Sequence, residues 1–144
     1  MSNNSYEIRY NTLSEEQIVR HYEENGISLP NQSLEEYACK LKANAELIEL
    51  WHSGKLVGLC ACYMNNFDSK VSYISHIAIL ETYRGLKLGE YLISHVEQNA
   101  KSKGFDCMQL EVSKNNVAAY KFYQKMGYER KEDRGTKMLM YKSL

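Results

Sequence analysis

The sequence has one proline, no proline- or glycine-rich linker and no internal repeat. Because nothing divides its 144 residues, we expect a single domain over residues 1–144, long enough to bury one hydrophobic core. The longest nearly continuous apolar stretch, residues 56–64, is too short to cross a bilayer. The polar start, residues 1–4, lacks the basic and apolar regions of a signal peptide, so we expect a cytoplasmic protein without a membrane partner.

The sequence also lacks an excess of either charge, with 18 basic and 18 acidic side chains and a net charge of zero. Nucleic acid is therefore not an expected partner, and any anion-binding site must be local. Four cysteines are present, at Cys39, Cys60, Cys62 and Cys107. They fit neither a disulfide framework nor the paired spacing of a zinc site, and His21, His52 and His95 share no ligand spacing. We expect reduced cysteines, with Cys60 and Cys62 buried on one strand face, and no bound metal.

Apolar periodicity and turn residues predict the local structure. Helices are expected after the capping residues Ser14 and Ser33, and over residues 88–103 and 116–126. Strands are expected at residues 6–10, 46–52, 55–65, 70–80, 108–112, 128–132 and 136–142, the last two as a hairpin around Asp133-Arg134-Gly135. The helix between strands 70–80 and 108–112 makes those strands parallel, whereas hairpins make their partners antiparallel. The predicted fold class is α/β (α+β), with a mixed, mostly antiparallel central sheet of six to seven strands and about four helices.

The most informative stretch is residues 77–90, where a strand leads through a basic, glycine-bearing turn into a helix. The free N–H groups of a first helical turn and the helix dipole attract anions, and Arg84 and Lys87 add full charges. A diphosphate fits this arrangement. Taken alone, two glycines in a turn are also typical of an ordinary strand-to-helix connection.

Two motifs together resemble the GNAT acetyltransferase superfamily over most of the chain. The run Arg84-Gly85-Leu86-Lys87-Leu88-Gly89 resembles its phosphate loop, Arg/Gln-x-x-Gly-x-Gly/Ala. About 30 residues later, Asn116, Ala119, Tyr123 and Gly127 have the spacing of its last-helix signature, with Tyr128 replacing a common Phe. The resemblance implies an acetyl-CoA-dependent N-acetyltransferase in which the parallel strands splay apart and an amine attacks the thioester directly.

The resemblance assigns the candidate site residues. It implies that acetyl-CoA is held by Ile77, Ala78, Ile79, Arg84, Gly85, Leu86, Lys87, Leu88, Gly89, Glu90 and Asn116. Backbone groups of the strand would pair with the pantetheine arm, and an N–H near Ile79 would polarise the thioester carbonyl. The hydroxyl of Tyr123 would protonate the departing thiolate, although a helix tyrosine is often only a packing residue.

Lys87 departs from the motif, because it stands where the family usually has glycine. The lysine predicts that position 87 has a backbone conformation that a residue with a side chain adopts without strain. If the position is left-handed instead, the loop is strained by roughly 1–2 kcal/mol and phosphate binding is weaker.

The sequence offers no obvious general base. Many relatives carry a Glu on the strand before the loop, whereas here Ser75 or His76 occupies that neighbourhood, and Glu81 is expected on a solvated face. His76 has a suitable ordinary pKa and is our catalytic candidate beside Tyr123, but a lone strand histidine is often structural. For an acceptor whose amine has a pKa near 8, water alone suffices.

Two rival functions remain: a non-catalytic sensor of acyl-CoA and a nucleotide-phosphate protein. The second is disfavoured because neither a P-loop nor a three-glycine dinucleotide fingerprint is present. The expected partners are coenzyme A and an amine acceptor, which can be an amino sugar, an amino acid, a polyamine or a protein amine. Symmetry favours a homodimer as the assembly to test for.

Overall fold

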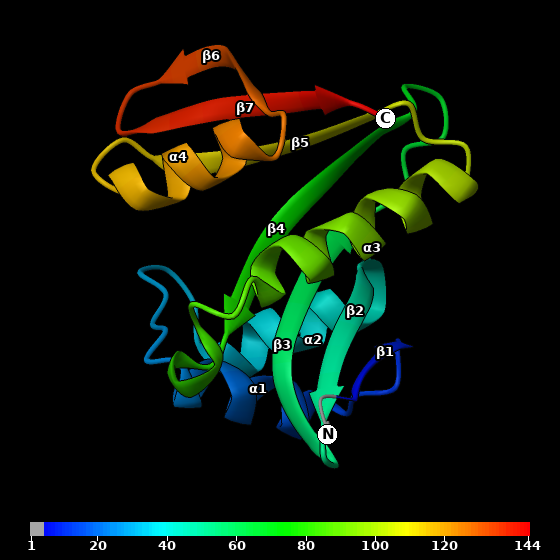
Figure 1. The fold of residues 1–144 in the computed structure, drawn as a ribbon, viewed down its shortest axis with the longest axis vertical. Coiled ribbons are helices and arrows are strands. Elements are labelled where there is room, and N and C mark those ends of the chain that lie inside the picture. Colours follow the sequence, from blue (N-terminus) through cyan, green and yellow to red (C-terminus); the bar gives the residue numbers. More distant parts are fainter. Residues whose placement is uncertain (1–4) are drawn as a thin grey trace.

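The computed structural model describes residues 5–144, in which a seven-stranded sheet has the order β1-β2-β3-β4-β5-β7-β6 (Figure 1). The strands are β1 (Tyr6–Tyr10), β2 (Glu46–His52), β3 (Lys55–Tyr63), β4 (Val71–Ile79), β5 (Cys107–Ser113), β6 (Glu129–Arg134) and β7 (Lys137–Ser143). The helices are α1 (Glu15–Glu24), α2 (Leu34–Asn44), α3 (Leu88–Ser102) and α4 (Val117–Lys125), and a short 3-10 helix, η1, spans Glu81–Tyr83. Among the strands of residues 5–144, only β4 and β5 pair in parallel, so the predicted mixed sheet with about four helices is confirmed.

Local capping signals set the helix boundaries. Ser14 and Ser33 each form a complete capping box at the start of α1 and α2, and these boxes satisfy N–H groups that a helix start leaves free. Helix α3 ends before Gly104, whose φ of +94° allows the N–H of Phe105 to return to the carbonyl of Ala100. These positions agree with the predicted helices.

The sheet separates two hydrophobic clusters. One lies beneath α3 and α4 and includes Cys60 and Cys62, which are fully buried as predicted. The other lies beneath α1 and α2 and includes Leu59 and Ala61, the alternate residues of β3. Strands β2 to β4 are therefore covered on both faces, and at the end of β4 Ile77 and Ala78 pack in different clusters.

The feature that positions the site is the short pairing between β4 and β5. Only residues 71–74 of β4 pair with residues 107–110 of β5. Beyond this point β4 stays with β3 while β5 stays with β7, and Figure 1 shows the two strands diverging. The expected splayed pair is thus present.

A bulge in β4 lies where the splay begins. Ala61 pairs with His76 and Cys62 with Ile74, so Ser75 is an extra residue in the strand. Its hydroxyl lies 2.6 Å from the Tyr37 hydroxyl of α2, and the ring of His76 packs edge-on against Tyr22 of α1. The bulge thereby directs two consecutive residues of β4 toward the α1–α2 layer.

The final hairpin differs from its predicted form. Asp133 and Arg134 belong to β6 and pair with Met138 and Lys137, so the turn is Gly135-Thr136. The Asp133 carboxylate accepts a hydrogen bond from the N–H of Gly135, which has a φ of +80°. This bond stabilises the tighter turn, a contact that strand periodicity does not reveal.

Candidate active site

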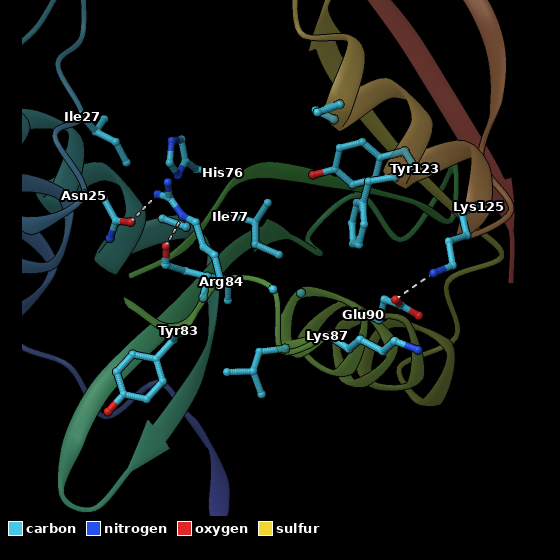
Figure 2. Close-up of a pocket in the computed structure, with 18 residues that line it drawn as sticks. Asn25, Ile27, His76, Ile77, Tyr83, Arg84, Lys87, Glu90, Tyr123 and Lys125 are labelled. Carbon is cyan, nitrogen blue, oxygen red and sulfur yellow. Dashed lines mark hydrogen bonds and ion pairs between the residues drawn. The ribbon is translucent and has the colours of Figure 1, made fainter. Parts of the chain in front are cut away.

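A cavity of about 790 Å³ opens where β4 and β5 separate. It is bounded by the end of β4, the loop after η1, the first turn of α3, one side of α4 and the loop after α1 (Figure 2). Its size lies within the range of small-molecule sites. The predicted site residues that line it are His76, Ile77, Ala78, Ile79, Arg84, Gly85, Lys87, Leu88, Gly89, Glu90 and Tyr123.

Two predicted residues lie outside this cavity. Leu86 points to solvent with 57% of its surface exposed. Asn116 caps α4, where its side chain accepts the N–H of Ala119, and lines a second cavity of about 320 Å³. That cavity lies in the gap between β4 and β5 and shares His76, Ile77, Ala119 and Tyr123 with the first. The structure therefore places Asn116 beside the candidate site.

The loop before α3 is held in place by η1. The Tyr83 hydroxyl lies 3.3 Å from Nδ1 of His52, on the β2–β3 hairpin, and the two rings pack edge to face. Gly85 and Lys87 both have left-handed backbones, with φ of 80° and 62°. The sequence-based expectation that Lys87 has an angle comfortable for a side chain is therefore wrong, because this turn needs a left-handed residue immediately before the helix.

Cationic side chains lie around the start of α3. Lys87 is the N-cap of α3, and Lys125 of α4 forms a 3.2 Å ion pair with Glu90 in the first turn of α3. Figure 2 shows Lys87 directed toward the side of that ion pair and away from Arg84. Together with the free N–H groups of the first helical turn, these charges suit a polyanion.

Tyr123 faces the cavity from α4. Its carbonyl accepts the N–H of Tyr128 at the end of α4, next to Gly127, which has a φ of +98°. Figure 2 shows its hydroxyl pointing into the cavity above Ile77, while the side chain is 8% exposed. Burial, with a smaller contribution from nearby Cys60, raises the pKa of this phenol well above its ordinary value. The hydroxyl therefore keeps its proton at neutral pH and is available as a donor.

His76 faces the cavity from β4. Burial, followed by the nearby His21, lowers the pKa of its imidazole. Its Nδ1 is buried and has no hydrogen-bond partner among residues 5–144. A neutral imidazole of this kind can accept a proton, whereas the Ser75 hydroxyl is engaged with Tyr37 and Glu81 is exposed, as expected.

Arg84 reaches away from the start of α3. Its Nε donates to the carbonyl of Ile79 at 3.0 Å, and its Nη2 donates to Oδ1 of Asn25 at 3.2 Å. Asn25 is the C-cap of α1 and lies in the α1–α2 layer. The guanidinium thus links the loop before α3 to the end of α1.

Sequence reasoning missed several residues that line the cavity. They are Asn25, Ile27, Tyr83, Ala118, Phe122 and Lys125, whereas Ala119 was identified only through its place in the last-helix signature. The Asn25-Gly26 pair was visible only as a helix stop, and Phe122 only as a packing neighbour of Tyr123. Phe122 also packs on α3, since a Cβ on Gly89 would lie 3.4 Å from its ring. Such contacts depend on how distant elements meet.

Among residues 5–144, no group of three or more His, Cys, Asp or Glu side chains is arranged to hold a metal ion. Within the same range, no helix is both long and apolar enough to cross a membrane.

Comparison with known proteins identifies similar sequences and folds. Residues 10–128 match the family model described as the acetyltransferase (GNAT) family. The chain is 33% identical over 87 residues to a probable N-acetyltransferase of Drosophila melanogaster, a match that covers 58% of this chain and 47% of that protein. The chain spans about half the length of the curated relatives it matches.

Two solved structures share the fold. The ribosomal-protein-S18-alanine N-acetyltransferase of Escherichia coli has a TM-score of 0.80 at 17% identity, covering 96% of this chain and 94% of that chain. The PaiA N-acetyltransferase of Thermoplasma acidophilum, solved with coenzyme A, has a TM-score of 0.77 at 19% identity, covering 97% and 99%. At these identities the likeness establishes the arrangement of the elements.

Proposed function

The chain belongs to the acetyltransferase (GNAT) family, and we propose that it transfers the acetyl group of acetyl-CoA to a primary amine. One observation carries the proposal: a single cavity at the splay of β4 and β5 joins a cationic helix start to a buried, protonated phenol. The cationic helix start can bind the diphosphate of coenzyme A, and the phenol can donate a proton to its sulfur. The family neighbour solved with coenzyme A supports this choice of co-substrate.

The diphosphate end of the cofactor would lie at the start of α3. Backbone groups from Gly85 to Glu90 supply N–H donors there, and Lys87 adds a full charge. Each charge at a helix end contributes about 0.3–1 kcal/mol, so several donors converging on one diphosphate supply a few kcal/mol. The pantetheine arm would extend along Ile77 to Ile79, where β4 has no β5 partner.

The chemistry then follows from the groups around the thioester. The amine nitrogen forms a bond to the carbonyl carbon, a backbone N–H near Ile79 stabilises the oxygen, and the carbon–sulfur bond breaks. The sulfur leaves with the electron pair and takes a proton from Tyr123. The surplus proton of the amine passes to His76 or to water, and a proton returned to the phenol completes the cycle.

Replacing Tyr123 by phenylalanine tests the proposal. We expect Tyr123→Phe to lower kcat by about 10²–10⁴-fold, because general acid catalysis contributes that much, with little change in acetyl-CoA affinity. Thiol release with a panel of amines measures kcat, and calorimetry measures cofactor binding. Tyr120→Phe, on the same helix but outside the cavity lining, is the matched control.

Two outcomes would contradict the proposed mechanism or function. Equal activity of Tyr123→Phe would remove this phenol from the mechanism. Tight binding of coenzyme A without turnover of any amine would instead identify a non-catalytic acyl-CoA sensor.

A further inference from the structure

Arg84 lies in the half of the cavity opposite the start of α3. Figure 2 shows its guanidinium beside His76 and Asn25 on the left, while Lys87 and Lys125 lie on the right. The loop after η1 carries the Arg84 backbone toward α3, but the side chain turns back across the end of β4. The Arg84 side chain therefore lies apart from the start of α3, where the diphosphate is proposed to bind.

Both partners of the guanidinium are firmly held. Asn25 donates from Nδ2 to the carbonyl of His21 at 2.9 Å, and Gly26, with a φ of +68°, lets Ile27 bond back to the carbonyl of Tyr22. The other partner is the carbonyl of the last residue of β4. Two of the five N–H donors of a guanidinium are used in this way, so three remain for a ligand.

The Arg84 guanidinium has no acidic partner within residues 5–144. None of the ion pairs formed within residues 5–144 involves Arg84, and its two partners are neutral oxygens. His76 stays neutral because burial lowers its pKa. Lys87 at the start of α3 is a separate cation beside the N–H groups of the first helical turn, so a diphosphate there does not require this guanidinium.

On this basis, and resting on the proposed function, we propose that the Arg84 side chain binds an anionic group of the acceptor rather than the diphosphate of coenzyme A. The acceptor would be a small amine that also carries a carboxylate, phosphonate or phosphate group. A guanidinium binds such groups through paired hydrogen bonds, and Figure 2 shows it beside His76, one of the two proposed acceptors of the amine proton.

The experiment compares wild type with Arg84→Gln on matched acceptors. Glycine is paired with glycinamide, and 2-aminoethylphosphonate with ethylamine, so that one member of each pair lacks the anion. We expect Arg84→Gln to raise KM for the anionic member by about tenfold or more, the loss typical of a charge-assisted hydrogen bond, with KM for the neutral member unchanged. The two pairs distinguish a carboxylate from a phosphonate.

Cofactor binding supplies the second readout. The dissociation constant of coenzyme A, measured by calorimetry, should change by less than about twofold in Arg84→Gln, whereas loss of a charge-assisted contact to the diphosphate would raise it tenfold or more. The matched control is Arg130→Gln, which removes an exposed arginine of β6 remote from the cavity lining. Arg84→Lys, which keeps the charge but not the paired donors, should restore only part of the anion preference.

The outcomes separate this inference from the proposed function. A tenfold loss of coenzyme A affinity in Arg84→Gln, or equal effects on anionic and neutral acceptors, would overturn the role given to Arg84. If no amine is acetylated, the proposed function fails, and titration of the CoA-loaded protein with glycine and 2-aminoethylphosphonate decides the inference. Binding that Arg84→Gln abolishes would support it, and absence of binding would overturn it.

Discussion

Lys87 holds a left-handed backbone at the start of α3, with φ of 62° and ψ of 22°. A side chain in this conformation costs roughly 1–2 kcal/mol, which glycine avoids, although glycine loses more backbone entropy on folding. We therefore expect Lys87→Gly to raise the free energy of unfolding by about 1 kcal/mol, measured by urea denaturation. Lys87→Ala removes the same charge but keeps the strain, so it should give no such gain.

The same pair of variants shows whether the strain affects the cofactor. Both lack the ammonium group, so any difference in their affinity for coenzyme A comes from the backbone alone. Equal stability of the two variants would show that the left-handed conformation carries no cost here.

At the residue scale, the sequence identified which side chains gather around the cavity better than it identified their orientation. Tyr123, His76 and most of the loop before α3 line one cavity, as the motifs predict. The turn of Arg84 toward Asn25 was not predictable, because it depends on where the end of α1 packs against β4. The positive φ of Lys87 was indicated only by the glycine usual at this motif position, because lysine itself does not favour a left-handed backbone.

At the element scale, α1 is joined to β4 through His21. Its Nε2 donates to the carbonyl of Ala78 at 3.1 Å, and the side chain is 1% exposed. Burial is the main cause of a lowered pKa for both His21 and His76. The packing of this helix on this strand therefore favours two neutral imidazoles.

This packing predicts loss of stability in acid. The unfolded imidazoles take up protons near pH 6.5, whereas the folded ones resist until a lower pH, so the unfolded state binds more protons in between. The free energy of unfolding should fall as the pH drops below about 6.5, by at most about 1.4 kcal/mol per pH unit for each histidine. The loss is complete below the folded pKa values.

Urea denaturation at pH 7.5 and pH 5 measures this effect. His76→Gln should reduce the difference in unfolding free energy between the two pH values, whereas His95→Gln, on α3, should leave it as in wild type. An unchanged pH dependence in His76→Gln would contradict a neutral buried imidazole at this position.

Elements fixed by local chemistry were predicted more closely than those that depend on long-range contacts. The capping boxes at Ser14 and Ser33 involve residues three positions apart, so the sequence alone gives both helix starts. The final turn was misplaced because the Asp133 carboxylate also bonds Lys114, which lies in the distant loop after β5. Periodicity carries no information about that contact.

At the scale of the whole molecule, the sheet consists of two parts that share little pairing. Strands β1 to β4 form one part and β5, β7 and β6 the other, and within residues 5–144 strand pairing joins them only at residues 71–74 and 107–110. A hydrophobic cluster beneath α3 and α4 crosses this junction. The order of helices and strands predicted the parallel pair, but the volume and lining of the gap depend on side chains from five segments.

A ligand that lies in this gap contacts both parts and should stabilise them together. Coenzyme A at 100 times its dissociation constant adds about 2.7 kcal/mol to the free energy of unfolding. If the pantetheine arm pairs with β4, hydrogen exchange should slow most at residues 75–79 and 84–90, because those amides gain partners or lose contact with water. Mass spectrometry of peptides from the free and bound protein measures the change.

The edge of the sheet farthest from the gap provides the internal control. In the part of the chain that the structure describes, strand β1 pairs only with β2, so its exchange should change only as far as global stability does. Protection that is uniform along the chain would mean that coenzyme A stabilises the fold without pairing with β4. Protection at residues 84–90 but not at 75–79 would place the diphosphate at α3 and the arm elsewhere, which would separate the thioester from Tyr123.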